Sequence, residues 1–122
     1  MIGYAMVGAN DLDKAKSFYD SVLGELGAKR AWGADRMQAY ATSDNAPPLV
    51  VCKPHDGKAA TFGNGTMIAL AAPSREVVEK VYKKALASGA KDEGAPGLRG
   101  ETFYGAYFRD LDGNKLCVYK SG

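Results

Sequence analysis

The sequence contains few of the residues on which metal, disulfide and redox chemistry depend. Its 122 residues include one histidine and two cysteines. Two cysteines are too few for a disulfide scaffold, and the unmatched settings of Cys52 and Cys117 favour reduced thiols. We therefore expect a cytoplasmic protein.

Two further absences concern membranes and export. No apolar run approaches the ~20 residues that a membrane span needs. No charged-then-apolar leader opens the chain. The sequence therefore predicts neither a membrane partner nor secretion.

Neither sign of charge dominates. The 16 lysines and arginines and the 14 aspartates and glutamates give a net charge of +2, with both signs scattered along the chain. Nucleic-acid binding requires basic residues clustered on one face, so we expect no nucleic-acid partner. The 46% apolar composition is that of a globular protein, and the length suits a single domain, residues 1–122.

What the chain does contain is one pattern that occurs twice. A short apolar strand, an amphipathic helix and a closing Gly-Ala-Lys follow one another in residues 1–29 and again in residues 65–91. Aligning Tyr4 with Met67 also places Tyr19 on Tyr82. Such a period indicates one supersecondary unit used twice, and two copies related by symmetry naturally enclose a cleft.

The first copy is predicted to span residues 1–54 with the order βαβββ. A helix is expected to begin at Asn10 or Asp11 and to end at Gly24 or Gly27. The strands around it are expected at residues 2–8, 30–32, 36–42 and 49–53.

The second copy is predicted to span residues 65–120 in the same order, after a linker at residues 55–64. A helix is expected between Ser74 and Gly89, followed by an irregular loop at 91–102. Three strands are located there, at residues 66–71, 103–109 and 115–120, one fewer than the order βαβββ requires. The fold class is therefore α+β.

Side-chain alternation along the strands separates a face covered by the helix from a face that is free to form a shared concavity. The residues predicted beneath the helices are Ala5, Val7, Leu49, Val51, Ile68, Leu70, Leu116 and Val118. The residues predicted to face the concavity are Tyr4, Met6, Val50, Cys52, Met67, Ala69 and Cys117.

Several segments together resemble one known family. They are Asn10-Asp11-Leu12, Phe18-Tyr19, Val22-Leu23-Gly24, Ala71-Ala72-Pro73-Ser74, Gly94-Ala95-Pro96-Gly97-Leu98-Arg99 and residues 104–116. The family is the glyoxalase / bleomycin-resistance / extradiol-dioxygenase superfamily, or vicinal oxygen chelate proteins, which more often has proline at the position of Leu111. The resemblance implies two βαβββ modules that form a shared open cleft, the glyoxalase/bleomycin resistance/dihydroxybiphenyl dioxygenase fold.

The resemblance also implies where a metal would be held. Enzymes of this family bind a divalent metal with His and Glu side chains from the first and last strands of each half. Carried over to this chain, those positions fall on Tyr4, Met67, Cys117 and, near the fourth, Val50. These side chains do not suit a hard metal ion, so we expect no metal site and no cofactor.

Other candidates for chemistry are weaker. His55 lies in a turn of the linker without partner ligands, and Glu101 lies in a loop that could overhang the cleft. Cys117 could be a nucleophile if a cation lowered its pKa, or a buried thiol that fills the space of a missing ligand. Arg99 and Arg36 could each supply an anion contact or simply lie on the surface.

These observations favour a protein that binds a small aromatic or apolar molecule in an apolar cleft, without the usual metal ligands. The pocket is predicted to include Tyr4, Met6, Val50, Met67, Cys117, Tyr104 and Arg99. Tyr104 and Tyr107 have opposite parity, so at most one of them can face the cleft. The alternatives are a metal-dependent lyase (lactoylglutathione lyase-like) or dioxygenase with non-standard ligands and a divalent metal, and a module without a pocket. The resemblance further implies a homodimer.

Overall fold

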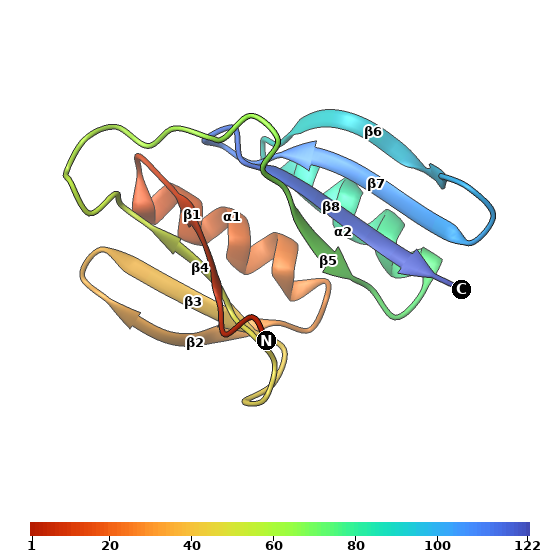
Figure 1. The fold of residues 1–122 in the computed structure, drawn as a ribbon, viewed down its shortest axis with the longest axis horizontal. Helices are drawn as coiled ribbons and strands as arrows, with labels where there is room; N and C mark the ends of the chain where they lie inside the picture. Colours follow the sequence, from red (N-terminus) through yellow and green to blue (C-terminus); the bar gives the residue numbers. More distant parts are fainter.

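The computed structural model describes residues 1–122, which form two helices and eight strands (Figure 1). The first half contains β1 (Ala5–Gly8), α1 (Leu12–Gly24), β2 (Lys29–Ala34), β3 (Met37–Ala41) and β4 (Leu49–Cys52). The second half contains β5 (Ile68–Ala71), α2 (Arg75–Ala87), β6 (Lys91–Leu98), β7 (Phe103–Arg109) and β8 (Lys115–Ser121). Both halves therefore have the predicted order βαβββ.

The two sheets have the same topology. Their strand orders are β1-β4-β3-β2 and β5-β8-β7-β6, and in each the first strand pairs in parallel with the last. Met6 lies opposite Val50 in one sheet, and Ala69 lies opposite Cys117 in the other. The repeat predicted from the sequence is thus confirmed.

Strand β6 corrects one prediction. Residues 91–102 were expected to form an irregular loop because they contain three glycines and one proline, yet Lys91–Leu98 pairs with β7. The strand lies at the sheet edge, where Pro96 can be tolerated although it lacks an N–H donor. Its register shifts on both sides of Gly94, so the irregularity appears as bulges within a strand.

Each helix begins with a side-chain cap. The carboxylate of Asp11 accepts a hydrogen bond from the backbone N–H of Lys14, and the hydroxyl of Ser74 accepts one from Val77. Each helix is followed by a glycine with positive φ, Gly27 at 78° and Gly89 at 103°. The two Gly-Ala-Lys segments are therefore equivalent helix endings. Neither helix is long and apolar enough to span a membrane.

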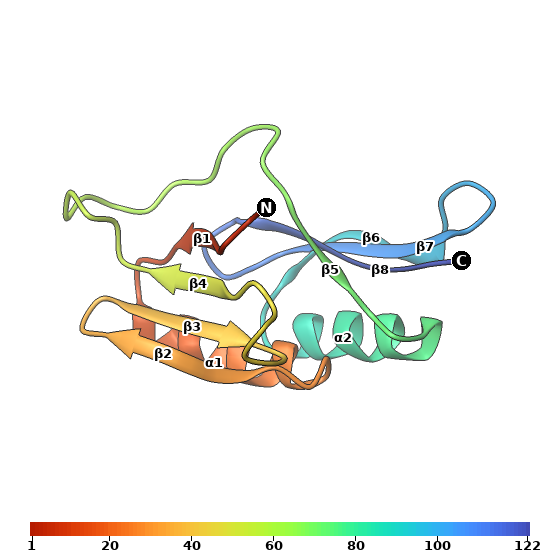
Figure 2. The ribbon, with the colours of Figure 1, turned by 60° about the horizontal axis from the view of Figure 1, so that its bottom comes forward.

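The helices lie on the same side of the molecule, next to one another, and the sheets cover them (Figure 2). Nineteen buried residues from both halves form one core between helices and sheets. The predicted strand faces are confirmed, since Val7, Leu49, Val51, Leu116 and Val118 belong to this core and Ala5, Ile68 and Leu70 pack against it. The opposite face of each sheet is therefore the open one.

A buried carboxylate ties the halves together. Asp110 lies in the turn between β7 and β8, and its oxygens accept hydrogen bonds from the Tyr19 hydroxyl and the Asn114 amide. Backbone N–H groups of Asp112 and Asn114 donate to it as well, each at 2.9 Å. The Asn114 amide also donates to the carbonyl of Gly8 at 2.9 Å. The C-terminal turn thereby bonds to α1 and β1 of the other half.

The linker is held at the same junction. The backbone N–H of Ala60 donates to the side-chain oxygen of Asn10 at 2.7 Å. The Phe62 ring lies over Gly113 so closely that a Cβ there would approach it to 2.5 Å, and the Arg109 guanidinium lies 5.4 Å from the ring centre. The connection between the halves is thus packed against the turn that joins them.

Replacing Tyr19 by phenylalanine tests this junction. Y19F removes one donor from a buried carboxylate, so the free energy of unfolding in urea should fall by about 2 kcal/mol. Tyr82 occupies the equivalent position of the repeat, but its hydroxyl donates to the exposed Asp92. Y82F is the matched control and should cost roughly 0.5 kcal/mol or less; equal losses would contradict a special role for Tyr19.

Candidate functional site

The open face of the first sheet carries an exposed aromatic pair. Tyr4, just before β1, and Trp32, on β2, meet edge to face with ring centres 6.1 Å apart. Their exposed fractions are 56% and 45%, and Met6 beside Tyr4 is 43% exposed. Val50, opposite Met6, is fully buried yet is not part of the helix-side core. This face is therefore apolar, with large side chains at its surface.

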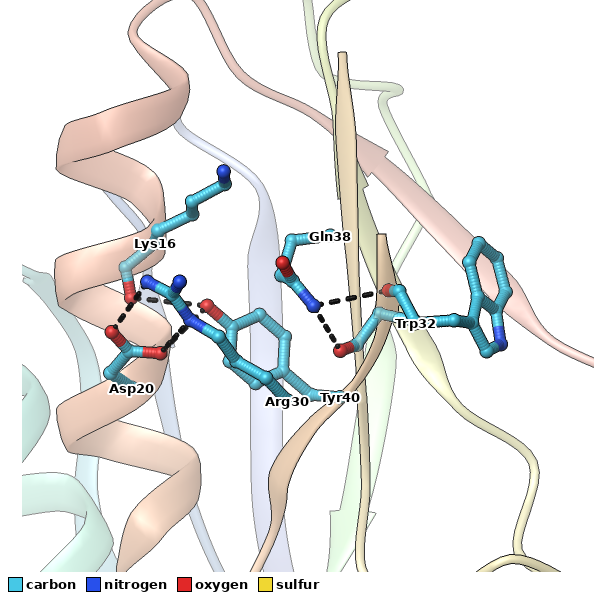
Figure 3. Close-up of polar contacts among 7 residues, drawn as sticks. Lys16, Asp20, Arg30, Trp32, Gln38 and Tyr40 are labelled. Carbon is cyan, nitrogen blue, oxygen red and sulfur yellow. Dashed lines mark hydrogen bonds and ion pairs between the residues drawn. The ribbon is translucent and has the colours of Figure 1, made fainter. Parts of the chain in front are cut away.

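Polar contacts on the helix side explain why Trp32 points to the open side (Figure 3). Arg30 binds both carboxylate oxygens of Asp20 on α1 at 2.9 Å, and the Tyr40 hydroxyl donates to the same carboxylate. The register of β2 shifts between Arg30 and Gly33, where the Gln38 amide donates to the carbonyl of Trp32. The Trp32 ring consequently lies across the strands from α1.

The contacts of Arg30 and Tyr40 with Asp20 persist over a wide pH range. The hydrogen bond from Arg30 lowers the pKa of the Asp20 carboxyl below its ordinary value. Burial and then the bond to Asp20 raise the pKa of Tyr40, whose hydroxyl therefore keeps its proton. Both groups stay in the states that hold β2 against α1 throughout the neutral pH range.

The open face of the second sheet is more polar. Met67, before β5, is 42% exposed, whereas Cys117 on β8 is buried. Tyr107 lies opposite Cys117, and the Arg99 guanidinium lies 5.3 Å from the Tyr107 ring centre. Further along the sheet, the rings of Phe103 and Tyr119 stack with centres 5.0 Å apart.

The predicted position of Tyr104 was wrong. It was expected to line the cleft, but its hydroxyl donates to Glu79 on α2, and the Arg75 guanidinium lies over its ring. Alternation along β7 places Tyr104 with the core residues Ala106 and Phe108, so Tyr107 is the one on the open face. Strand alternation predicted that only one of Tyr104 and Tyr107 could face the cleft, but it did not show which one.

Cys117 lacks the environment of an activated thiol. Burial raises the pKa of its sulfhydryl, and Tyr107, Arg99 and Lys115 lower it by less than burial raises it. Because its pKa is raised, this thiol is protonated at neutral pH. It therefore lacks the thiolate, which is the reactive form. The hypothesis of a buried thiol filling space fits these facts better than a nucleophile.

The predicted site residues line none of the main hollows of the chain. One hollow, of about 580 Å³, lies at the end of the first sheet and is lined by residues that include Arg30, Trp32, Thr42 and Asp44. It contains none of the seven residues predicted for the pocket. Tyr4, Met6 and Val50 lie on one sheet, and Met67, Cys117 and Arg99 lie on the other. A single chain thus presents two open surfaces.

The residues at the implied metal positions do not fit a hard divalent ion. Val50 has no donor atom, Tyr4 offers a phenol, Met67 a thioether and Cys117 a protonated thiol. No group of three His, Cys, Asp or Glu side chains converges anywhere in the structure. His55 and Glu101 are exposed in loops, and neither belongs to a cluster of possible metal ligands.

Sequence reasoning did not select Trp32 or Tyr107 for the site. The orientation of Trp32 depends on the register shift between Arg30 and Gly33, which leaves no periodic signal in the sequence. Tyr107 was one of two tyrosines of opposite parity on one strand. The aromatic run at residues 103–108 gives no local sign of which of these tyrosines faces the helix.

Known proteins resemble this chain in sequence and fold. A family model described as the Glyoxalase/Bleomycin resistance protein/Dioxygenase superfamily matches residues 1–118. A glyoxalase/bleomycin resistance protein from Albidiferax ferrireducens T118 has 36% identity and a TM-score of 0.92, with 100% of this chain and 99% of that chain covered.

More distant structures share the fold alone. Hypothetical protein SA1046 from S. aureus has 23% identity and a TM-score of 0.74, with 96% of this chain and 91% of that chain covered. Fosfomycin resistance protein FosX from Mesorhizobium loti has 15% identity and a TM-score of 0.71, with 100% and 92% covered. No curated protein matches the sequence.

Thiol labelling tests the state of Cys117. In the native protein at pH 7.5, iodoacetamide should modify Cys117 far more slowly than in the chain unfolded in urea, because the thiol is buried and protonated. Peptide mass spectrometry separates it from Cys52, which is also buried and serves as the internal reference. Rapid native labelling of Cys117 alone would identify an activated nucleophile.

Proposed function

This chain belongs to the glyoxalase/bleomycin resistance protein/dioxygenase superfamily, and we propose that within it the protein binds a small aromatic or apolar molecule without a metal. The observation that carries this proposal is the chemistry at the four positions where the family holds its metal. A phenol, a thioether, a protonated thiol and an isopropyl group can contact a ligand, but they cannot polarise it as a metal does.

The exposed apolar side chains support a binding role. Tyr4, Met6, Trp32 and Met67 lie on the open sheet faces, each between 42% and 56% exposed. Large apolar groups gathered on one side of a soluble domain are typical of interaction sites. The Tyr4–Trp32 pair in addition offers ring faces and edges to a flat ligand.

We further propose that the cleft is completed by a second copy of the chain. The open faces of one chain carry the apolar side chains, yet the pocket residues do not enclose a cavity within it. In a homodimer, the first sheet of one copy can face the second sheet of its partner, which brings Tyr4 and Met6 of one chain toward Met67 of the other. Burial of these side chains would drive the association.

Ligand binding is tested with an uncharged aromatic probe. 2-Naphthamide should raise the thermal midpoint, because a ligand that binds only the native state adds about 2.7 kcal/mol of stability at 100 times its Kd. Y4A should weaken this effect, whereas Y82A, which alters a tyrosine of α2 instead, should leave it unchanged.

The same preparation decides the metal question. Protein purified without chelator should contain no stoichiometric zinc, nickel, iron or manganese by elemental analysis. A full equivalent of one of these metals, lost together with binding on chelation, would favour a metal-dependent lyase or dioxygenase instead.

The dimer is tested by sedimentation. The wild-type protein should sediment as a dimer, and M6E should shift it toward the 12.9 kDa monomer because the charge would have to be buried. L111E is a matched control, since Leu111 has the same 43% exposure but lies in the hairpin turn between β7 and β8. A wild-type monomer at all concentrations would refute the shared cleft.

A further inference from the structure

Arg99 is a cation on the open face of the second sheet that no carboxylate neutralises. The ion pairs of the protein involve other cations, namely Arg30, Lys84 and Arg109. Arg109, on the same sheet, is held by Glu93 at 2.7 Å. Arg99 instead lies over the Tyr107 ring, with its positive charge available to the open side.

Backbone carbonyls fix the Arg99 guanidinium in place. Its Nη1 donates to the carbonyls of Gly97 and Gly105 and its Nη2 to that of Ala95, all at 2.8 Å. A Cβ at Gly94 would approach Nη2 to 3.0 Å, and one at Gly97 would approach Nη1 to 3.3 Å, so glycine leaves the room that the guanidinium occupies. A cation ordered in advance loses little entropy when it binds an anion.

Two donors remain free. Of the five N–H groups of the guanidinium, three bond to the carbonyls, which leaves one on Nε and one on Nη2 without an acceptor. Adjacent nitrogens of an arginine can bind the two oxygens of one carboxylate. Lys115 adds a second positive charge, with its Nζ 5.6 Å from the Tyr107 ring centre. This charge also helps to lower the pKa of Glu93.

From this arrangement we propose that Arg99 binds the carboxylate of an aromatic ligand in the cleft. The inference rests on the proposed function and narrows its ligand class, from aromatic or apolar molecules to small aromatic carboxylates. Tyr107 and the exposed Met67 would contact the ring of the ligand, while Arg99 holds its acid group. The bonds of Arg99 to Gly97 and Gly105 also brace the loop between β6 and β7, and the test must separate this bracing from binding.

The experiment compares two probes of nearly equal shape by titration calorimetry, 2-naphthoate and its uncharged amide, 2-naphthamide. Wild-type protein should bind the naphthoate more tightly. R99Q should weaken the naphthoate about 10- to 100-fold and leave the amide unchanged. R36Q is the matched control, because Arg36 likewise donates to a backbone carbonyl, that of Lys53, but on the first sheet; it should change neither affinity.

Each other outcome overturns the inference in a distinguishable way. Equal binding of both probes by wild type and R99Q would reject the role of Arg99 and leave the proposed function intact. An equal loss of both probes in R99Q would show that Arg99 only braces its loop. Binding of neither probe would reject the proposed function itself.

A second measurement applies if R99Q does not fold. In the wild-type protein, the Nε–H resonance of Arg99 should shift on addition of 2-naphthoate and not on addition of 2-naphthamide. An unmoved resonance at saturating naphthoate would overturn the inference.

Discussion

The arrangement of the molecule depends on how one buried carboxylate is satisfied. Asp110 is almost fully buried, and a carboxylate in that position is costly unless donors surround it. Its donors come from α1 of the first half and from the turn of the second, while Asn114 extends the network to Gly8. Together with the shared core, these hydrogen bonds fix one sheet relative to the other and so fix the direction in which the open faces point.

Much of this fold could be predicted from the sequence, because the repeat and the strand parity are both periodic signals. The repeat even required a strand where the local composition suggested a loop, and β6 shows that the repeat was the better guide. The orientation of Trp32 and the contacts of Arg99 could not be predicted, since each depends on a local departure from regular strand pairing. The Asp110 network joins residues from distant parts of the chain, so no local pattern indicates it.

The two halves share one topology but carry different open faces. The first presents Tyr4, Met6 and Trp32, and the second presents Arg99 and Lys115 around Tyr107. In the proposed dimer the apolar face of one chain would lie opposite the cationic face of the other, which suits a ligand with an apolar ring and an acid group.

The pinned linker has a consequence for how two chains can associate. Long connections between similar halves often allow neighbouring molecules to exchange those halves, a process that requires the connection to open. Here Ala60 is bonded to Asn10 and Phe62 is wedged against Gly113, so opening would break the junction itself. These contacts therefore oppose an exchange of halves and favour the proposed association of complete folds.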